Sequence, residues 1–155
     1  MNTAMSEGGT RMALGLAGYR IECVDTPDDQ DYTVVGKGLQ AYNIQHAGES
    51  GHRPLCLFLH APDGEVVGGL AGSTYWDWFY VDLFWLREDV RGQGHGHRLI
   101  ELAENEARER GARGVYLDTF SFQAPDFYRD HGYEVFGELS DFPRGHRRYF
   151  FKKAL

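Results

Sequence analysis

A turn with a glycine at every second position most constrains what this chain can fold into. Gly92, Gly94 and Gly96 leave a stretch of backbone with few side chains. An apolar, strand-like segment at residues 79–86 precedes the turn, and a helix-like segment at residues 99–110 follows it. A helix N-terminus offers unpaired N–H groups and a partial positive charge, and glycine lets an anion approach them closely. The pattern therefore predicts a phosphate-binding turn between a strand and a helix.

Length and composition indicate one globular domain. The chain has 155 residues, of which 42% are hydrophobic and 14% aromatic, which is enough to bury a core without disulfides. Cys23 and Cys56 lie in apolar, strand-like stretches, so we expect buried free thiols, in agreement with a reducing cytoplasm. We expect residues 1–18 to form a flexible lead-in that is not a secretory signal, and residues 19–155 to form the domain.

Charge and hydropathy exclude several classes of partner. The net charge of −7 argues against nucleic acid and favours a cationic small molecule or a basic peptide. No stretch reaches the ~20 apolar residues of a membrane span, so we expect no membrane partner. His95 and His97 are two positions apart and point to different sides of a helix start. We therefore expect no metal site there.

Periodicity and turn residues predict a mixed sheet with helices on its faces. Asp28, Asp29 and Asp31 are candidate caps for a helix that runs to about Gln45, and Gly36 and Gly38 are expected to weaken or break it. The nearly continuous apolar run at residues 79–86 predicts a central strand that is buried on both faces. The other expected elements are a strand at 19–24, a hairpin of 55–60 and 66–75 around a turn at 62–64, a strand at 115–120, a short helix at 124–131 and strands at 133–139 and 147–152.

Several interpretations of the glycine turn compete. A dinucleotide-binding fold needs G-x-G-x-x-G directly after a strand. Here His97 occupies the place of the third glycine and a charged segment at residues 87–90 intervenes, although Asp118 lies near where a ribose-binding acid would fall. A P-loop is excluded because no Gly-Lys-Ser/Thr follows. A glycine turn without a ligand is a further alternative.

Two motifs give the chain a resemblance to a known superfamily. Residues 91–96, R-G-Q-G-H-G, resemble the R/Q-x-x-G-x-G/A pyrophosphate motif of the GNAT acyltransferases. Residues 127–133, F-Y-R-D-H-G-Y, resemble the later Y-x-x-x-G-F/Y segment of that superfamily. The order of the expected elements agrees over residues 19–153, and residues 117–128 resemble a bacterial subgroup whose substrates are mostly unassigned. The resemblance implies an α/β (α+β) fold with about six to seven strands in a mixed central sheet, about four helices and a splayed strand pair.

The resemblance also implies a donor and a set of contacts to it. GNAT enzymes transfer an acetyl group from acetyl-CoA to an amine, without a metal. Backbone N–H groups would hold the CoA pyrophosphate, the preceding strand end would pair with the pantetheine, and an N–H near Leu86 would polarise the thioester carbonyl. The residues implied in donor binding are Trp85, Leu86, Arg87, Arg91, Gly92, Gln93, Gly94, His95, Gly96, His97 and Tyr128.

Three residues are candidates for acid–base chemistry. The resemblance places Tyr128 near the departing sulfur, where it would act as general acid or would only pack and orient CoA. An amine of pKa near 10.4 is almost fully protonated at pH 7, so a base is needed. Asp82 and Asp118 each interrupt an apolar strand beside the expected gap. Either carboxylate could serve as the base, directly or through water.

Together these observations predict a cytoplasmic N-acetyltransferase that acts on a primary amine of a small molecule or peptide. The resemblance suggests a homodimer. The alternative is a non-catalytic acyl-CoA-binding or sensor protein with the same fold. The acceptor is left open between a polyamine, an antibiotic, an amino acid and a protein amine.

Overall fold

Residues 11–155 are described by a computed structural model, in which the chain divides into two units after Glu49. The first unit contains strand β1 (Arg11–Leu14), the 3-10 turn η1 (Leu16–Gly18), strand β2 (Arg20–Cys23) and helix α1 (Asp29–Ala47). β1 and β2 pair antiparallel in a sheet of their own. Of the expected lead-in, residues 1–10 lie outside the described residues, and residues 11–18 carry β1 and η1.

Helix α1 begins at an aspartate cap. The side chain of Asp28 accepts a hydrogen bond of 2.7 Å from the N–H of Gln30, which confirms the predicted cap. The helix continues through Gly36 and Gly38, so the expected break at these glycines is wrong. Each glycine costs only about 1 kcal/mol relative to alanine. A helix of 19 residues tolerates that cost because each added residue contributes another backbone hydrogen bond.

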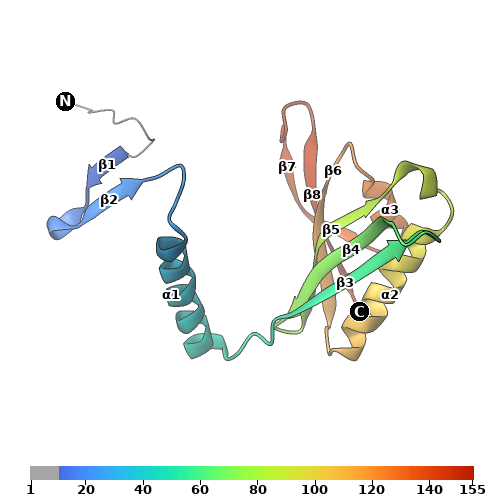
Figure 1. Cartoon of the computed structure of the whole chain (residues 1–155), viewed down its shortest axis with the longest axis horizontal. Helices are drawn as coiled ribbons and strands as arrows, with labels where there is room; N and C mark the ends of the chain where they lie inside the picture. The colour runs from blue at the N-terminus through green and yellow to red at the C-terminus, as the bar shows by residue number, and fades with distance from the viewer. Residues whose placement is uncertain (1–10) are drawn as a thin grey trace. The chain divides into compact units, whose positions relative to one another are not determined.

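The second unit contains a six-stranded sheet in the order β3-β4-β5-β6-β8-β7 (Figure 1). Only the β5–β6 pair is parallel, and helix α2 (His95–Glu109) forms its crossover. The turn at residues 62–64 joins β3 to β4, as predicted. The strands are β3 (Arg53–His60), β4 (Val66–Tyr75), β5 (Trp78–Leu86), β6 (Gly114–Phe120), β7 (Glu134–Ser140) and β8 (Arg147–Ala154).

The core of this unit lies between the sheet and α2, which runs along one face of β3, β4 and β5 (Figure 1). Ile100 and Ala103 from α2 are buried in one cluster with Phe79, Val115 and Phe151 from three strands. Each buried aliphatic or aromatic side chain of this kind contributes roughly 1.5–3 kcal/mol. Helix α3 (Pro125–Asp130) brings the number of α-helices in the described residues to three, one fewer than expected.

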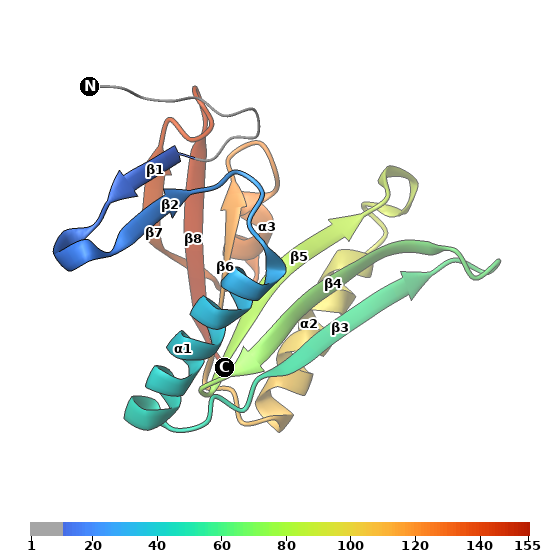
Figure 2. The same cartoon turned by 60° about the vertical axis from the view of Figure 1, so that its left-hand side comes forward.

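The β5–β6 pair separates part-way along its length. Parallel pairing extends only from Trp78 to Val81 on β5, whereas β5 stays paired with β4 as far as Leu86. Asp82 is a β-bulge, because its neighbours Val81 and Leu83 face consecutive residues of β4. A bulge bends its strand and increases the local twist. β5 therefore diverges from β6 beyond Val81, which is the splayed pair that was expected (Figure 2).

The two faces of β5 differ in burial. Phe79 and Val81 lie on the core face and are 0% and 4% exposed, whereas Leu83 and Trp85, which follow the bulge, lie on the opposite face and are 65% and 55% exposed. The expected burial of the whole strand on both faces is therefore wrong for its second half. The strand keeps a central position in the sheet, as predicted. Cys23 and Cys56 are free thiols, as predicted, but both are exposed, so their expected burial is wrong.

Candidate active site

The glycine turn folds because two of its glycines adopt a conformation that other residues avoid. Gly92 and Gly94 have φ of 70° and 88°, in the left-handed region. Gly94 is also the N-cap of α2. Gly96 has an ordinary φ, and a Cβ placed there would lie 3.4 Å from Phe127 and 3.5 Å from Leu86. The first two glycines thus serve backbone conformation, whereas a Cβ at position 96 would make only ordinary contacts.

Helix α2 starts at His95, four residues before the predicted helix. The N–H of Arg98 donates to the carbonyl of Gly94 at 3.1 Å and opens the helical ladder. The N–H groups of residues 95–97 precede that bond and have no acceptor within the helix. The first turn carries no acidic residue. These N–H groups and the helix dipole form an environment that favours an anion.

Two side chains tie the turn to the strand before it. Arg91 Nε donates to the carbonyl of Leu86 at 2.8 Å, and Gln93 Nε2 donates to the carbonyl of Asp89 at 2.7 Å. Arg87 instead forms ion pairs with Asp89 and Glu65, at 2.6 Å and 2.7 Å. The charge of Arg91 therefore lies beside the helix start, while the charge of Arg87 is compensated by carboxylates.

The end of β5 has an open backbone edge. The N–H of Arg87 donates to the carbonyl of Val67 on β4 at 2.8 Å. Antiparallel strands alternate between residues that bond to the partner strand and residues that face away from it. Phe84 and Leu86 therefore direct their N–H and C=O groups away from β4, toward the side on which β6 has diverged, where the Leu86 carbonyl already accepts from Arg91. An extended ligand could pair there as an added strand. Phe84 was missed by sequence reasoning, because the alternation becomes known only with the register.

Tyr128 lies in α3 and is 8% exposed. Its ring packs edge-on against Tyr133 and lies 5.8 Å from the ring of Phe151. Burial raises the pKa of Tyr128 to about 12, and the negative charge of Asp118 contributes to the rise. The hydroxyl therefore stays protonated at neutral pH and acts as a hydrogen-bond donor.

The two predicted carboxylates lie in different environments. Arg148 on β8 donates from Nε and Nη2 to Asp118, and Nη2 contacts both carboxylate oxygens. Asp82 accepts one long bond of 3.5 Å from the hydroxyl of Tyr80, and within residues 11–155 it forms no ion pair. Burial, and then the charges of Asp118 and Asp82, raise the pKa of Tyr80. The structure thus gathers Tyr80 and both carboxylates where the strands part.

A histidine pair adjoins the helix start. His97 Nδ1 lies 2.9 Å from His131 Nε2, and His131 Nδ1 lies 2.7 Å from the carbonyl of Phe127. Because a carbonyl only accepts, His131 donates from Nδ1, and when neutral it accepts at Nε2 from His97. Sequence reasoning missed His131, since the two histidines are 34 residues apart and no local pattern connects them.

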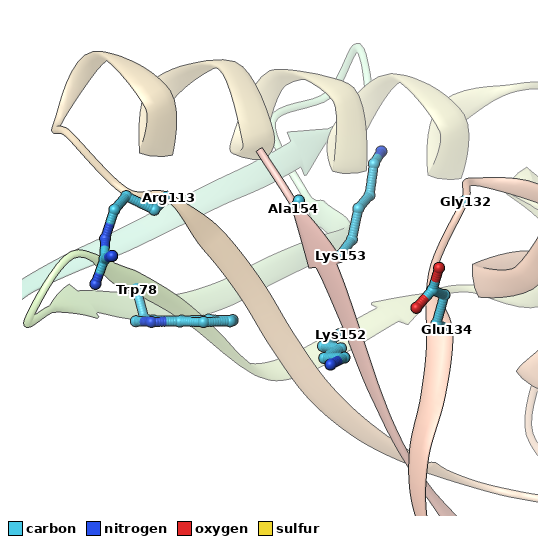
Figure 3. Close-up of a pocket in the computed structure, with 7 residues that line it drawn as sticks. All are labelled: Trp78, Arg113, Gly132, Glu134, Lys152, Lys153 and Ala154. Carbon is cyan, nitrogen blue, oxygen red and sulfur yellow. The ribbon is translucent and has the colours of Figure 1, made fainter.

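The described part of the chain has no group of three or more His, Cys, Asp or Glu side chains arranged to hold a metal ion. Within residues 11–155, no helix combines the length and apolar character needed to cross a bilayer. A cavity of about 410 Å³ lies at the end of β5 far from the glycine turn (Figure 3). It is lined by Trp78, Arg113, Gly132, Glu134, Lys152, Lys153 and Ala154, none of which is a predicted site residue.

The splayed sheet and the glycine turn at the start of α2 define the class of protein, an acetyltransferase. The chain belongs to the acetyltransferase (GNAT) family, which it matches over residues 21–133, and it is an N-acetyltransferase. An acetyltransferase of Agrobacterium fabrum is 37% identical over 121 residues, covering 78% of this chain and 88% of that protein.

Two further similarities agree with this assignment. The blasticidin-S acetyltransferase of Streptomyces morookaense is 43% identical over 93 residues, covering 59% of this chain and 68% of that protein. The crystal structure of an acetyltransferase from Bacillus cereus superposes with a TM-score of 0.79 at 32% identity, covering 86% of this chain and 97% of that chain. The resemblance stated from the two motifs is thereby confirmed.

Proposed function

We propose that this protein transfers the acetyl group of acetyl-CoA to a primary amine of a small molecule or peptide. One observation carries the proposal: the open edge of β5 at Phe84 and Leu86 is joined to the glycine turn by the short segment 87–91. An extended pantetheine chain fits the edge, and the diphosphate fits the N–H groups of residues 95–97. Arg91, beside the same turn, adds the positive charge that a diphosphate requires.

The reaction forms one bond and breaks another. The protonated amine first loses one proton to a base; its nitrogen then bonds to the thioester carbonyl carbon, the C–S bond breaks, and the nitrogen loses a second proton, which passes to the departing sulfur. The free N–H of Leu86 or Phe84 on the open edge would donate to the carbonyl oxygen as negative charge develops there. The donor supplies an activated acyl group, so the chain's own task is to orient it and to manage the proton.

The role of Tyr128 follows from its pKa. A thiol has an ordinary pKa near 8.5, so complete transfer of a proton from a hydroxyl of pKa about 12 to a thiolate is unfavourable by about 5 kcal/mol. We therefore assign Tyr128 the role of hydrogen-bond donor to the departing sulfur. The proton that completes the thiol comes from the attacking amine.

Asp82 is the better of the two candidate bases. Using Asp118 would require breaking its ion pair with Arg148, whose nitrogens contact both carboxylate oxygens. Among the described residues, Asp82 has only the long bond from Tyr80, and it lies at the bulge where the strands part. It would accept the amine proton directly or through water. Asp118 then orients Arg148.

Asp82→Asn should lower kcat/KM by about 10²-fold at pH 7. The deficit should shrink toward pH 10, because the amine then loses its proton without help. Steady-state kinetics against pH measures both effects, with Asp130→Asn, an exposed change on α3, as the control. A deficit that is equally large at every pH would contradict the role of base.

Gly94→Ala should weaken CoA binding by about tenfold, because alanine at a φ of 88° costs roughly 1–2 kcal/mol. Gly96→Ala should bind CoA like the wild type, since its Cβ would make only ordinary contacts of 3.4 Å or more. Calorimetric titration with CoA measures both affinities. Equal losses of CoA affinity in the two variants would contradict the argument that the backbone conformation at Gly94 is needed for CoA binding.

The proposed reaction is tested with the full chain, acetyl-CoA and a panel of amines that includes blasticidin S, by following thiol release. CoA binding together with turnover of at least one amine is the expected result. CoA binding without turnover of any amine would contradict the proposal and favour the alternative, a non-catalytic acyl-CoA-binding protein. Light scattering on the same sample reports whether the protein is the homodimer that the family resemblance suggests.

A further inference from the structure

An exposed aromatic cluster lies beside the splay and has no part in the chemistry assigned above. Phe122 and Phe142 are 56% and 45% exposed. Phe122 stacks on Phe120 with the ring centroids 5.2 Å apart and the planes inclined by only 8°, and Phe142 meets Phe120 edge-on at 5.9 Å. We call Phe120, Phe122 and Phe142 the aromatic platform. Exposed flat rings of this kind favour a ligand that is itself flat.

The platform continues the face of the sheet on which Asp118 lies. Asp118 and Phe120 are two residues apart on β6 and therefore point to the same face. Across the β6–β8 ladder they face Phe150 and Arg148. Two residues of strand span roughly 7 Å, so a ring on the platform and an amine at the splay would be joined by a few bonds.

Two loops hold the platform in place. The N–H of Ser121 donates to the carbonyl of Arg147 at 2.8 Å, and the N–H of Arg147 donates back to the Ser121 hydroxyl at 3.1 Å. Within the β7–β8 loop, the N–H of Phe142 donates to the carbonyl of His146 at 3.1 Å. The rings are therefore positioned by backbone bonds rather than by contacts with one another alone.

Arg148 adds a directed donor to the platform. Its Cζ lies 5.3 Å from the ring centre of Phe120 and 5.7 Å from that of Phe142. Nε and Nη2 are bound to Asp118, whereas Nη1 donates to no group among residues 11–155. Asp118 balances the charge of Arg148, so the site offers N–H donors without a net charge that would select an anion.

We infer that the acceptor amine carries a neutral, planar, unsaturated ring that stacks on the aromatic platform and accepts a hydrogen bond from Arg148 Nη1. This inference rests on the proposed function, because it names the class of acceptor for the same reaction. Phe122 and Arg148 are then residues that determine specificity. They recognise the body of the acceptor and leave the transfer step to the residues at the splay.

Three amines of equal tether length test the inference: 2-cyclohexylethylamine, 2-phenylethylamine and 2-(pyridin-2-yl)ethylamine. We expect kcat/KM to rise in that order, because the second adds a flat ring and the third adds an acceptor atom. Phe122→Ala should lower kcat/KM by roughly tenfold for the two flat-ring amines and leave the cyclohexyl amine unchanged. Phe122→Trp, which keeps a flat ring, should retain the preference.

The matched control is Phe136→Ala, a change on β7 of a phenylalanine that is 54% exposed and lies outside the platform. Phe136→Ala should leave kcat/KM for all three amines unchanged. An equal loss for all three amines with Phe122→Ala, or no ring preference in the wild type, would overturn the inference. So would light scattering that shows a dimer for the wild type and a monomer for Phe122→Ala, since the platform would then bind a second copy of the chain.

Binding of the same amines, followed by NMR without acetyl-CoA, separates this inference from the proposed function. A preference for flat rings that Phe122→Ala abolishes, in a protein that turns over none of the amines, would support the platform and contradict acetyl transfer. Turnover without that preference would support acetyl transfer and contradict the platform.

Discussion

Lys153→Met should lower the free energy of unfolding by about 3–5 kcal/mol, because it leaves a buried carboxylate without its main partner. The side chain of Glu104, in the middle of α2, is 6% exposed. Lys153 Nζ donates to its two oxygens at 2.9 Å and 2.7 Å, and the Tyr133 hydroxyl donates at 2.9 Å. Figure 3 shows Lys153 directed from β8 toward α2.

Chemical denaturation of the full chain measures this loss. The double variant Glu104→Leu with Lys153→Met should recover most of it, since removing both charges also removes the cost of burying them. Arg98→Met is the matched control. Arg98 pairs with Glu101 on the same helix at 2.9 Å, but both side chains are more than 60% exposed, and such pairs contribute about 1 kcal/mol or less. Equal losses for Lys153→Met and Arg98→Met would contradict the argument from burial.

The same cluster bears on the site through Tyr133. Burial and the nearby Glu104 raise the pKa of the Tyr133 hydroxyl, so it remains a donor at neutral pH. The N–H of Tyr133 also donates to the carbonyl of Tyr128 at 3.0 Å. Tyr133 therefore connects the ion pair between α2 and β8 to α3, which carries the proposed catalytic residue Tyr128.

Tyr128→Phe should lower kcat by 10²–10³-fold, the usual cost of removing one donor from a developing negative charge. CoA affinity should stay within about twofold, because the ring and its packing remain. The measurement pairs steady-state kinetics with calorimetric titration. Tyr133→Phe is the control, and it should lower stability while changing kcat little. A Tyr128→Phe variant with wild-type kcat would leave Tyr128 only a packing role.

The pKa of Tyr128 also determines a pH dependence. The folded-state pKa of about 12 exceeds the ordinary value near 10, so folding favours the neutral hydroxyl. Its contribution to stability is complete below about pH 10 and is lost as the pH rises from 10 through 12. The kcat profile should show no decline from ionisation of this tyrosine below about pH 11. A wild-type decline near pH 10 that is missing in Tyr128→Phe would contradict the raised pKa.

Features encoded by neighbouring residues could be predicted from the sequence. The Asp28 cap, the β3–β4 hairpin and the glycine turn each depend on the conformational preferences of a few consecutive residues. The start of α2 was placed four residues late because the first turn contains Gly96 and two histidines, which weaken the helical pattern. The break expected at Gly36 was wrong because the free-energy cost of a glycine in the helix is outweighed by the hydrogen bonds of the rest of the helix.

Arrangements that join distant residues could not be predicted. From the sequence alone, Asp82 and Asp118 are equivalent candidates for the base. Only the β6–β8 register shows that Arg148 lies beside Asp118. The bulge at Asp82 and the resulting open edge at Phe84 depend on how β5 meets two different neighbours. The pairing of β2 with β1 was likewise not visible, because hydrophobic alternation identifies a strand but not its partner.

The sequence by itself therefore determined the family, the glycine turn and the identity of the candidate catalytic residues. These follow from residue types at short spacings, which conformational preference and motif resemblance can detect. Only the tertiary structure decided which carboxylate is bound to an arginine, which backbone groups are free, and which rings lie beside the splay. Those outcomes depend on strand register and burial, and both arise from contacts between residues far apart along the chain.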